Sequence, residues 1–193
     1  NRRVDVAIVS DVAKALSKIN ENFLNNKSSI NKKSWLEKID FWKNKHPLFL
    51  PPEEGEIYPQ EVLLKVRDFS PEAFITTDVG QHQMWAAQYL RNAPRRWISS
   101  AGLGTMGFGL PAAMGVKAAL PNAEVICIAG DASVLMNIQE LGTLTQYGLK
   151  IKIVIINNRW QGMVRQWQES FYDERYSSSD MSCGEPDFVK LAE

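Results

Sequence analysis

Short apolar runs alternate with amphipathic segments through the second half of the chain. Near-continuous apolar runs cover residues 73–77, 125–129 and 153–157, and a shorter one covers 97–100. Strands buried on both faces have this composition, whereas the stretches between them carry apolar residues at helical spacing. Strands that alternate with helices predict a doubly wound α/β fold, in which helices cover both faces of a parallel sheet.

Proline and glycine indicate where the helices begin and end. Pro59 is expected to open a helix, and further helices are expected over 81–90 and 111–120. A helix through Leu144 is expected to end at Gly148, because glycine readily takes the left-handed conformation of a helix terminator. The inward positions of the helix that begins at Pro59 are expected to be Val62, Leu63, Val66 and Phe69.

The first part of the chain has a different pattern. Residues 4–9 alternate and then run apolar, which predicts a strand, and Asp11 is placed to cap a helix behind it. The polar stretch 25–33 indicates a linker, and 35–42 predict a short amphipathic helix. The expected organisation is the remnant of another α/β domain over 1–24, a linker with a short helix over 25–58, and the main domain over 59–193.

Composition narrows the class of protein. The chain has 193 residues, 45% of them hydrophobic, which suffices for one ordinary domain with a real core. Its 22 Lys and Arg balance 22 Asp and Glu, so no nucleic acid is expected as a partner. The apolar runs are too short for a membrane span, so no membrane is expected either. Cys127 and Cys183 form neither a disulfide framework nor a zinc cluster, which favours a reducing compartment.

Both ends of the sequence look cut. It begins with Asn1 rather than Met and has no apolar signal segment. Residues 188–193 run out inside a predicted helix. A fragment of a longer chain is therefore expected.

Two polar side chains follow two of the predicted strands. Asp131 comes just after the strand 125–129, and Asn158 closes the strand 153–157, with room for one crossover helix between them. This arrangement brings both strand ends to one edge of the sheet, where open α/β sheets bind ligands. A carboxylate and a carboxamide oxygen at that edge suit Mg²⁺ holding a diphosphate.

Each of these residues also has an ordinary structural explanation. Asp131 has the position of a helix N-cap, and Asn158 that of a turn residue that tolerates positive φ. The pair together favours a metal site, which a backbone carbonyl near Trp160 and phosphate oxygens would complete. The neighbours of Asp131 suit an anion. Gly130 lets the backbone approach a ligand closely, and the Ala132 and Ser133 amides begin a helix-like turn that can donate to anionic oxygens.

The segment from Gly102 to Gly107 suggests a different cofactor. It matches the G-x-G-x-x-G fingerprint of dinucleotide-binding folds and lies between a strand and a helix, with Asp131 at the end of the next strand. A tight glycine turn without a ligand gives the same pattern, and helix-forming residues resume only near Pro111. A nicotinamide-dependent dehydrogenase is therefore an alternative, and a non-catalytic binding module is a third interpretation.

Three further side chains stand near the same predicted edge. His82 follows Gly80 and Gln81 at a strand end, and is either a histidine of the core or a donor to a diphosphate. Met106, raised on the glycine turn, either fills a gap in the core or supports a cofactor ring. Trp167 lies four residues after Met163, a spacing that predicts ordinary helix packing.

Together these motifs resemble one family. Gly130-Asp131-Ala132 followed by Asn157-Asn158 is similar to the thiamine-diphosphate motif, which begins Gly-Asp and ends Asn-Asn. Segments 80–88, 102–113 and 161–168 resemble the large catalytic subunit of acetolactate synthase, also called acetohydroxyacid synthase. The resemblance extends over essentially the whole chain. Residues 1–24 are similar to the end of that family's middle domain, and 59–193 to its thiamine-diphosphate-binding C-terminal domain without the distal end.

The resemblance implies a role for each matched residue. Mg²⁺ is bound in the family by residues that match the side chains of Asp131 and Asn158 and the backbone carbonyl of Trp160. The methionine matched by Met106 holds the cofactor in its bent form, and the tryptophan matched by Trp167 lines the substrate channel. Cofactor contacts are implied at Gly80, Gln81, His82, Gly104, Met106, Gly130, Asp131, Ala132, Ser133, Asn158, Gln161, Gly162 and Met163.

The resemblance also implies a reaction. It is decarboxylation of pyruvate and condensation of the hydroxyethyl unit with a second 2-oxo acid, in the biosynthesis of valine, leucine and isoleucine. The implied cofactors are thiamine diphosphate and Mg²⁺, with FAD bound mostly outside this chain. The implied partners are 2-oxo acids, a second catalytic subunit in a homodimer and a regulatory small subunit. The implied location is the plastid stroma or the cytoplasm of a cyanobacterium.

Two departures limit what the resemblance implies. Ala132 stands where the wider thiamine motif often has glycine, which favours acetolactate synthase over the general pattern. The family's activating glutamate lies in an N-terminal domain of the partner subunit, so no catalytic residue is assigned and the isolated chain is expected to be inactive. Pyruvate oxidase and glyoxylate carboligase share the metal motif and remain alternatives, although Gln166-Trp167-Gln168 favours acetolactate synthase.

Overall fold

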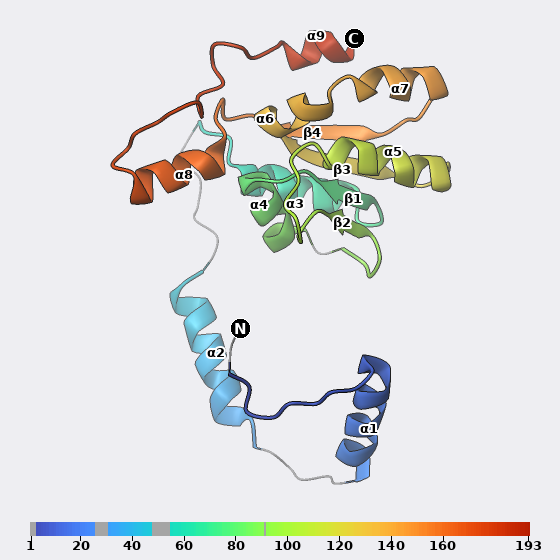
Figure 1. The fold of residues 1–193 in the computed structure, drawn as a ribbon, viewed down its shortest axis with the longest axis vertical. Coiled ribbons are helices and arrows are strands. Elements are labelled where there is room, and N and C mark those ends of the chain that lie inside the picture. Colours follow the sequence, from blue (N-terminus) through green and yellow to red (C-terminus); the bar gives the residue numbers. More distant parts are fainter. Residues whose placement is uncertain (1–2, 26–30, 48–54, 91) are drawn as a thin grey trace. The chain divides into compact units, whose positions relative to one another are not determined.

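The computed structural model describes residues 3–25, 31–47, 55–90 and 92–193 (Figure 1). The chain divides into two compact units, Asn1–Leu50 and Pro51–Glu193, which are described separately. Parts of the predicted linker, at 26–30 and 48–54, lie outside the described residues. The division into domains over 1–24, 25–58 and 59–193 stays a prediction.

Within its described residues the first unit holds two helices, α1 (Val12–Asn25) and α2 (Lys33–Lys45), as expected from the sequence. α1 begins behind Asp11, whose Oδ1 accepts a hydrogen bond from the Lys14 backbone N–H at 3.1 Å. The predicted strand over 4–9 is wrong, because these residues form no strand and their side chains are exposed. A strand needs a neighbour for its backbone groups, and the described part of this unit offers none.

The second unit alternates helices and strands. Its sheet has the order β2-β1-β3-β4 and every neighbouring pair is parallel, which confirms the predicted parallel sheet. No helix within the described ranges combines the length and the apolar character needed to cross a bilayer. In chain order the elements are α3 (Pro59–Phe69), β1 (Phe74–Thr77), α4 (Gln81–Tyr89), β2 (Trp97–Ser99), α5 (Gly109–Ala119), β3 (Val125–Gly130), α6 (Asp131–Val134), η1 (Leu135–Asn137), α7 (Glu140–Tyr147), β4 (Lys152–Ile156), α8 (Gly162–Phe171) and α9 (Phe188–Ala192).

Two apolar layers enclose the sheet between helices. On one face Ile126 and Ile128 belong to a cluster with residues of α3 and α4. On the other face Cys127 belongs to a cluster with residues of α5 and α7, and Figure 1 shows these helices around the strands. All six residues of β3 are buried, which explains why this central strand is a continuous apolar run.

Two details of the predicted helices are wrong. α5 begins at Gly109 rather than at Pro111. The helix can start before the proline because a proline in the first turn lacks only an N–H that would have no helical partner. Phe69 is 85% exposed, since it lies six residues after the buried Leu63 and about a third of a turn out of phase with it. The end of α7 at Gly148, with a left-handed φ of 62°, is as predicted.

The strand order reverses next to β1. β2 lies on one side of β1, whereas β3 and β4 lie on the other, so the crossover from β1 to β2 and the crossover from β2 to β3 run in opposite directions across the sheet. Open α/β sheets bind ligands at such a switch point, outside the carboxyl ends of the strands. Since Thr77 of β1 pairs with Ile128 of β3, the residues that follow these two strands emerge at the same edge.

Candidate functional site

A cavity with about 440 Å³ of empty space, partly open to solvent, lies at the carboxyl ends of β1, β3 and β4. All but two of the predicted site residues line it, although they come from four separate segments. They are Gly80, Gln81, His82, Met106, Gly130, Asp131, Ala132, Ser133, Asn158, Trp160, Gln161, Gly162 and Met163. The structure therefore brings the motifs together, while the role of each residue stays a prediction.

Two predicted residues are not part of this lining. Gly104 lies in the glycine loop, where its N–H donates to the Ser100 carbonyl at 3.0 Å. Trp167 is 57% exposed on α8, and its ring lies 4.8 Å from that of Phe171, measured between centroids. This is a contact between positions i and i+4 of one helix; the role of Trp167 in a substrate channel stays a prediction.

Four apolar residues complete the lining, although the sequence pattern did not single them out as ligand contacts. They are Val79, Trp85, Ile156 and Val164. The sequence could have indicated two of them as residues of the lining. Trp85 lies one helical turn after His82, and Ile156 is the last residue of β4. These side chains make the cavity partly apolar, as small-molecule sites usually are.

Asp131 is the first residue of α6 and not its cap, because Gly130 occupies the N-cap position. Its side chain is buried, and no hydrogen-bond partner among the described residues reaches Oδ2. Burial raises the pKa of the Asp131 carboxyl; backbone hydrogen bonds, including one at Asn158, lower it, and the Glu185 charge raises it further. Burying a carboxylate with an unpaired oxygen costs free energy, which a cation at Oδ2 would offset.

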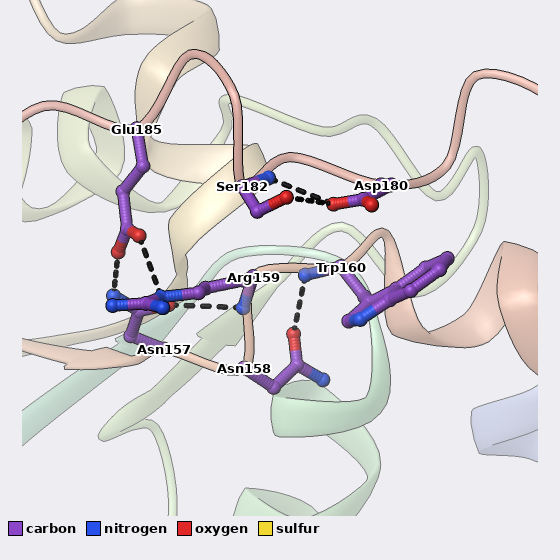
Figure 2. A network of polar contacts seen from close by, with 7 residues as sticks. All are labelled: Asn157, Asn158, Arg159, Trp160, Asp180, Ser182 and Glu185. Carbon is purple, nitrogen blue, oxygen red and sulfur yellow. Dashed lines mark hydrogen bonds and ion pairs between the residues drawn. The ribbon is translucent and has the colours of Figure 1, made fainter.

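Asn158 lies in a turn that two asparagine side chains hold (Figure 2). Asn157 Oδ1 accepts a hydrogen bond from the Arg159 N–H, and Asn158 Oδ1 accepts one from the Trp160 N–H, both at 3.0 Å. Arg159 has the left-handed φ of 60°, so the positive φ considered for Asn158 belongs to its neighbour. A carboxamide oxygen has two lone pairs, so Asn158 Oδ1 can serve the turn and a cation together.

Gly162 lies close to the polar side chains of Gln81 and Asn158. A Cβ at this position would lie 2.2 Å from Gln81 Oε1 and 2.9 Å from Asn158 Nδ2. Gln81 Nε2 also donates to Gln166 Oε1 at 3.2 Å, which ties the start of α4 to α8. A side chain at position 162 would therefore displace the ends of the Gln81 and Asn158 side chains.

Asp78 is an important residue beside the site that the sequence analysis did not single out. It is fully buried after β1, where Oδ1 accepts hydrogen bonds from the Val79 and Gly107 N–H groups, both at 2.8 Å, and Oδ2 accepts one from the Gly109 N–H at 3.2 Å. These bonds attach the glycine loop, which carries Met106, to the end of β1. The available signal was an acidic residue directly after an apolar strand.

His82 is a buried histidine whose Nε2 has no hydrogen-bond partner in the part of the chain that the structure describes. Burial lowers the pKa of His82 from 6.5 to about 4, outweighing the charge of Asp78 and a hydrogen bond to its backbone, which act to raise it. The imidazole is therefore neutral at pH 7 and brings a polar atom to the cavity without a charge.

We expect acidification to destabilise the folded domain through His82. Between pH 6.5 and about 4 the unfolded chain takes up a proton that the folded domain excludes, so the free energy of unfolding falls as the pH falls. The loss on going from pH 7 to below that range is up to about 3 kcal/mol. Urea unfolding of the wild type and His82→Gln at both ends of this range measures it. An equal pH dependence in the two proteins would contradict the assignment.

The donors around the cavity fit a diphosphate held by a divalent cation. The unpaired Oδ2 of Asp131, the Asn158 carboxamide and the Trp160 carbonyl are hard oxygen donors, which Mg²⁺ prefers. Across the described ranges, no group of three or more His, Cys, Asp or Glu could hold a metal ion. Phosphate and water oxygens would therefore have to complete the coordination of a cation at this place.

The sheet order and the position of the cavity define an open parallel α/β domain with a ligand cavity at its switch point. Residues 78–193 match the family model described as thiamine pyrophosphate enzyme, C-terminal TPP binding domain. The chain belongs to this family of thiamine pyrophosphate enzymes. The match gives no support to the nicotinamide alternative.

Similar proteins come from a cyanobacterium and from red algae. The chain is 65% identical over 192 residues to the acetolactate synthase large subunit of Parasynechococcus marenigrum, covering all of this chain and 31% of that protein. It is 52% and 54% identical over 195 residues to the acetolactate synthase large subunits of Cyanidium caldarium and Porphyra purpurea, covering 33% of each. These findings confirm the resemblance inferred from the motifs. The chain spans about a third of the length of these curated relatives.

Proposed function

We propose that this chain is the cofactor-holding part of an acetolactate synthase large subunit. The observation that carries the proposal is the 65% identity to such a subunit along the whole chain. The proposed reaction decarboxylates pyruvate and condenses the hydroxyethyl unit with a second 2-oxo acid, in branched-chain amino acid biosynthesis. Thiamine diphosphate, when bound, supplies the carbanion-stabilising chemistry that this decarboxylation needs.

The residues of this chain would bind and orient the cofactor. Asp131, Asn158 and the Trp160 carbonyl would hold Mg²⁺ against the diphosphate. His82, which is neutral at pH 7, would offer a hydrogen bond without adding a charge. Met106, on the loop attached to the end of β1, would support the cofactor ring.

Other parts of the proposed enzyme would come from outside this chain. The relatives are about three times as long, which leaves room for an activating glutamate and a flavin-binding domain elsewhere in the full-length protein. A homodimer would supply that glutamate from the partner subunit, and a regulatory small subunit would be a further partner. The origin of the relatives supports the cytoplasm of a bacterium or the plastid stroma.

Calorimetric titration of the full-length protein with thiamine diphosphate, with and without Mg²⁺, tests the cofactor site. We expect binding that requires Mg²⁺, because Asp131 presents an unpaired carboxylate oxygen. Product analysis with pyruvate should then give acetolactate, whereas a different product would favour pyruvate oxidase or glyoxylate carboligase. The isolated chain should form no acetolactate; measurable formation would contradict an activating residue outside it.

A further inference from the structure

A segment from further along the chain pairs with the turn that carries the proposed cation ligands. We call residues 179–185 the strap. Trp160 and Asp180 form an antiparallel bridge. Two backbone hydrogen bonds flank it, from Gln161 N to Ser179 O at 2.8 Å and from Met181 N to Arg159 O at 2.9 Å. The turn therefore follows β4 along the chain and pairs with the strap.

Glu185, at the end of the strap, reaches the turn itself (Figure 2). Its side chain is only 15% exposed, and its Oε2 lies 2.9 Å from Arg159 Nε. Its Oε1 accepts a hydrogen bond from Asn157 Nδ2. One carboxylate therefore binds the two residues on either side of Asn158.

Arg159 needs such support because its backbone is strained. Its φ of 60° is left-handed, a conformation that a residue with a Cβ adopts only at a cost in free energy. A strained backbone conformation persists where several surrounding contacts hold it in place. Three contacts do so here: the Asn157 carboxamide binds the Arg159 N–H, the strap binds its carbonyl, and Glu185 binds its guanidinium.

We propose that Glu185 is a positioning residue for the cation site. By holding Arg159 and Asn157 it fixes the turn that presents Asn158 Oδ1 and the Trp160 carbonyl to Mg²⁺. Glu185 lines a neighbouring groove rather than the cavity, so it contacts the turn and not the cofactor. Its charge also acts on the Asp131 carboxyl. The inference rests on the proposed function, because it concerns the same site.

Mg²⁺ titration of the full-length protein with thiamine diphosphate present tests this role by calorimetry. Glu185→Ala is expected to raise the Mg²⁺ concentration at half-saturation about tenfold or more, the range typical of residues that orient metal ligands. Glu185→Gln keeps an acceptor for Asn157 but loses the ion pair, so its effect should be smaller. The matched control is Glu72→Ala, which removes a carboxylate from an ion pair with Arg96 at the opposite end of β1 and should leave the value unchanged.

A second substitution separates positioning from general destabilisation. Arg159→Gly relieves the strain of the turn, since glycine has no Cβ. The effect of Glu185→Ala should therefore shrink several-fold in the Arg159→Gly background. An effect of full size in both backgrounds would overturn the inference, as would a lower melting temperature of Glu185→Ala with unchanged Mg²⁺ affinity. If instead the wild type binds thiamine diphosphate equally well without Mg²⁺, the proposed function fails.

Discussion

Replacing Asp131 by alanine is expected to abolish the Mg²⁺-dependent binding of thiamine diphosphate, with a loss of affinity greater than about 100-fold. Asp131 is 3% exposed and its Oδ2 has no partner within the described structure, so this oxygen is available to bind a cation. A direct ligand should matter more than the residues that orient ligands, which contribute about 10–100-fold. Titration calorimetry of the full-length protein at saturating Mg²⁺ measures the loss.

Asp187→Ala is the matched control for this substitution. Asp187 caps α9, where it accepts hydrogen bonds from the Val189 and Lys190 N–H groups at 3.2 and 3.1 Å. Losing this ordinary helix cap should cost about 1 kcal/mol of stability and leave cofactor affinity unchanged. Asp131→Ala should still fold, because it removes a buried charge rather than a packed apolar group. Wild-type affinity in Asp131→Ala would refute the metal-site interpretation.

Asp78→Ala is expected to lower the free energy of unfolding by about 3 kcal/mol or more. The substitution removes the acceptor of three backbone N–H groups, at Val79, Gly107 and Gly109. Each such group costs about 1–3 kcal/mol when it is buried without a partner. The glycine loop would lose its attachment to β1, so Met106 would shift and cofactor affinity should fall as well. Urea unfolding and cofactor titration measure the two effects.

Two further variants show whether the loop attachment is the cause. Asp78→Asn keeps one oxygen for Val79 and Gly107 but places an amide N–H₂ opposite the Gly109 N–H, so its loss should be intermediate. Asp68→Ala removes an exposed carboxylate that pairs with Arg67, and should change stability by less than about 0.5 kcal/mol. Equal losses for Asp68→Ala and Asp78→Ala would rule out the loop attachment as the cause.

The strands of the second unit could be predicted because a strand that is buried on both faces is apolar at nearly every position of its own sequence. Residues 125–129 are apolar without interruption, and the structure places them in a strand that pairs on both sides. Residues 4–9 have a similar local pattern but form no strand. Pairing depends on a second segment that the local pattern does not contain, so periodicity alone cannot separate the two cases.

The site could be predicted where topology alone decides the position of a residue. Asp131 and Asn158 follow strands that the crossover rule brings to one edge, and both line the cavity. Asp78 follows β1 in the same way, yet its carboxylate binds backbone N–H groups of the glycine loop. Which groups meet a carboxylate depends on how a loop folds back in three dimensions, and spacing does not contain that information.

The pairing between the strap and the turn also has a consequence for the order in which the domain matures during synthesis. A ribosome delivers β1, β3 and β4 before Glu185, so the sheet can assemble while the turn at Arg159 still lacks its ion pair. A domain generally folds as a unit during synthesis, and a contact cannot form before both of its residues have been made. The turn can therefore take its final form only after residue 185 has been made, so we expect the cofactor to be bound at full affinity only late in the synthesis of the domain.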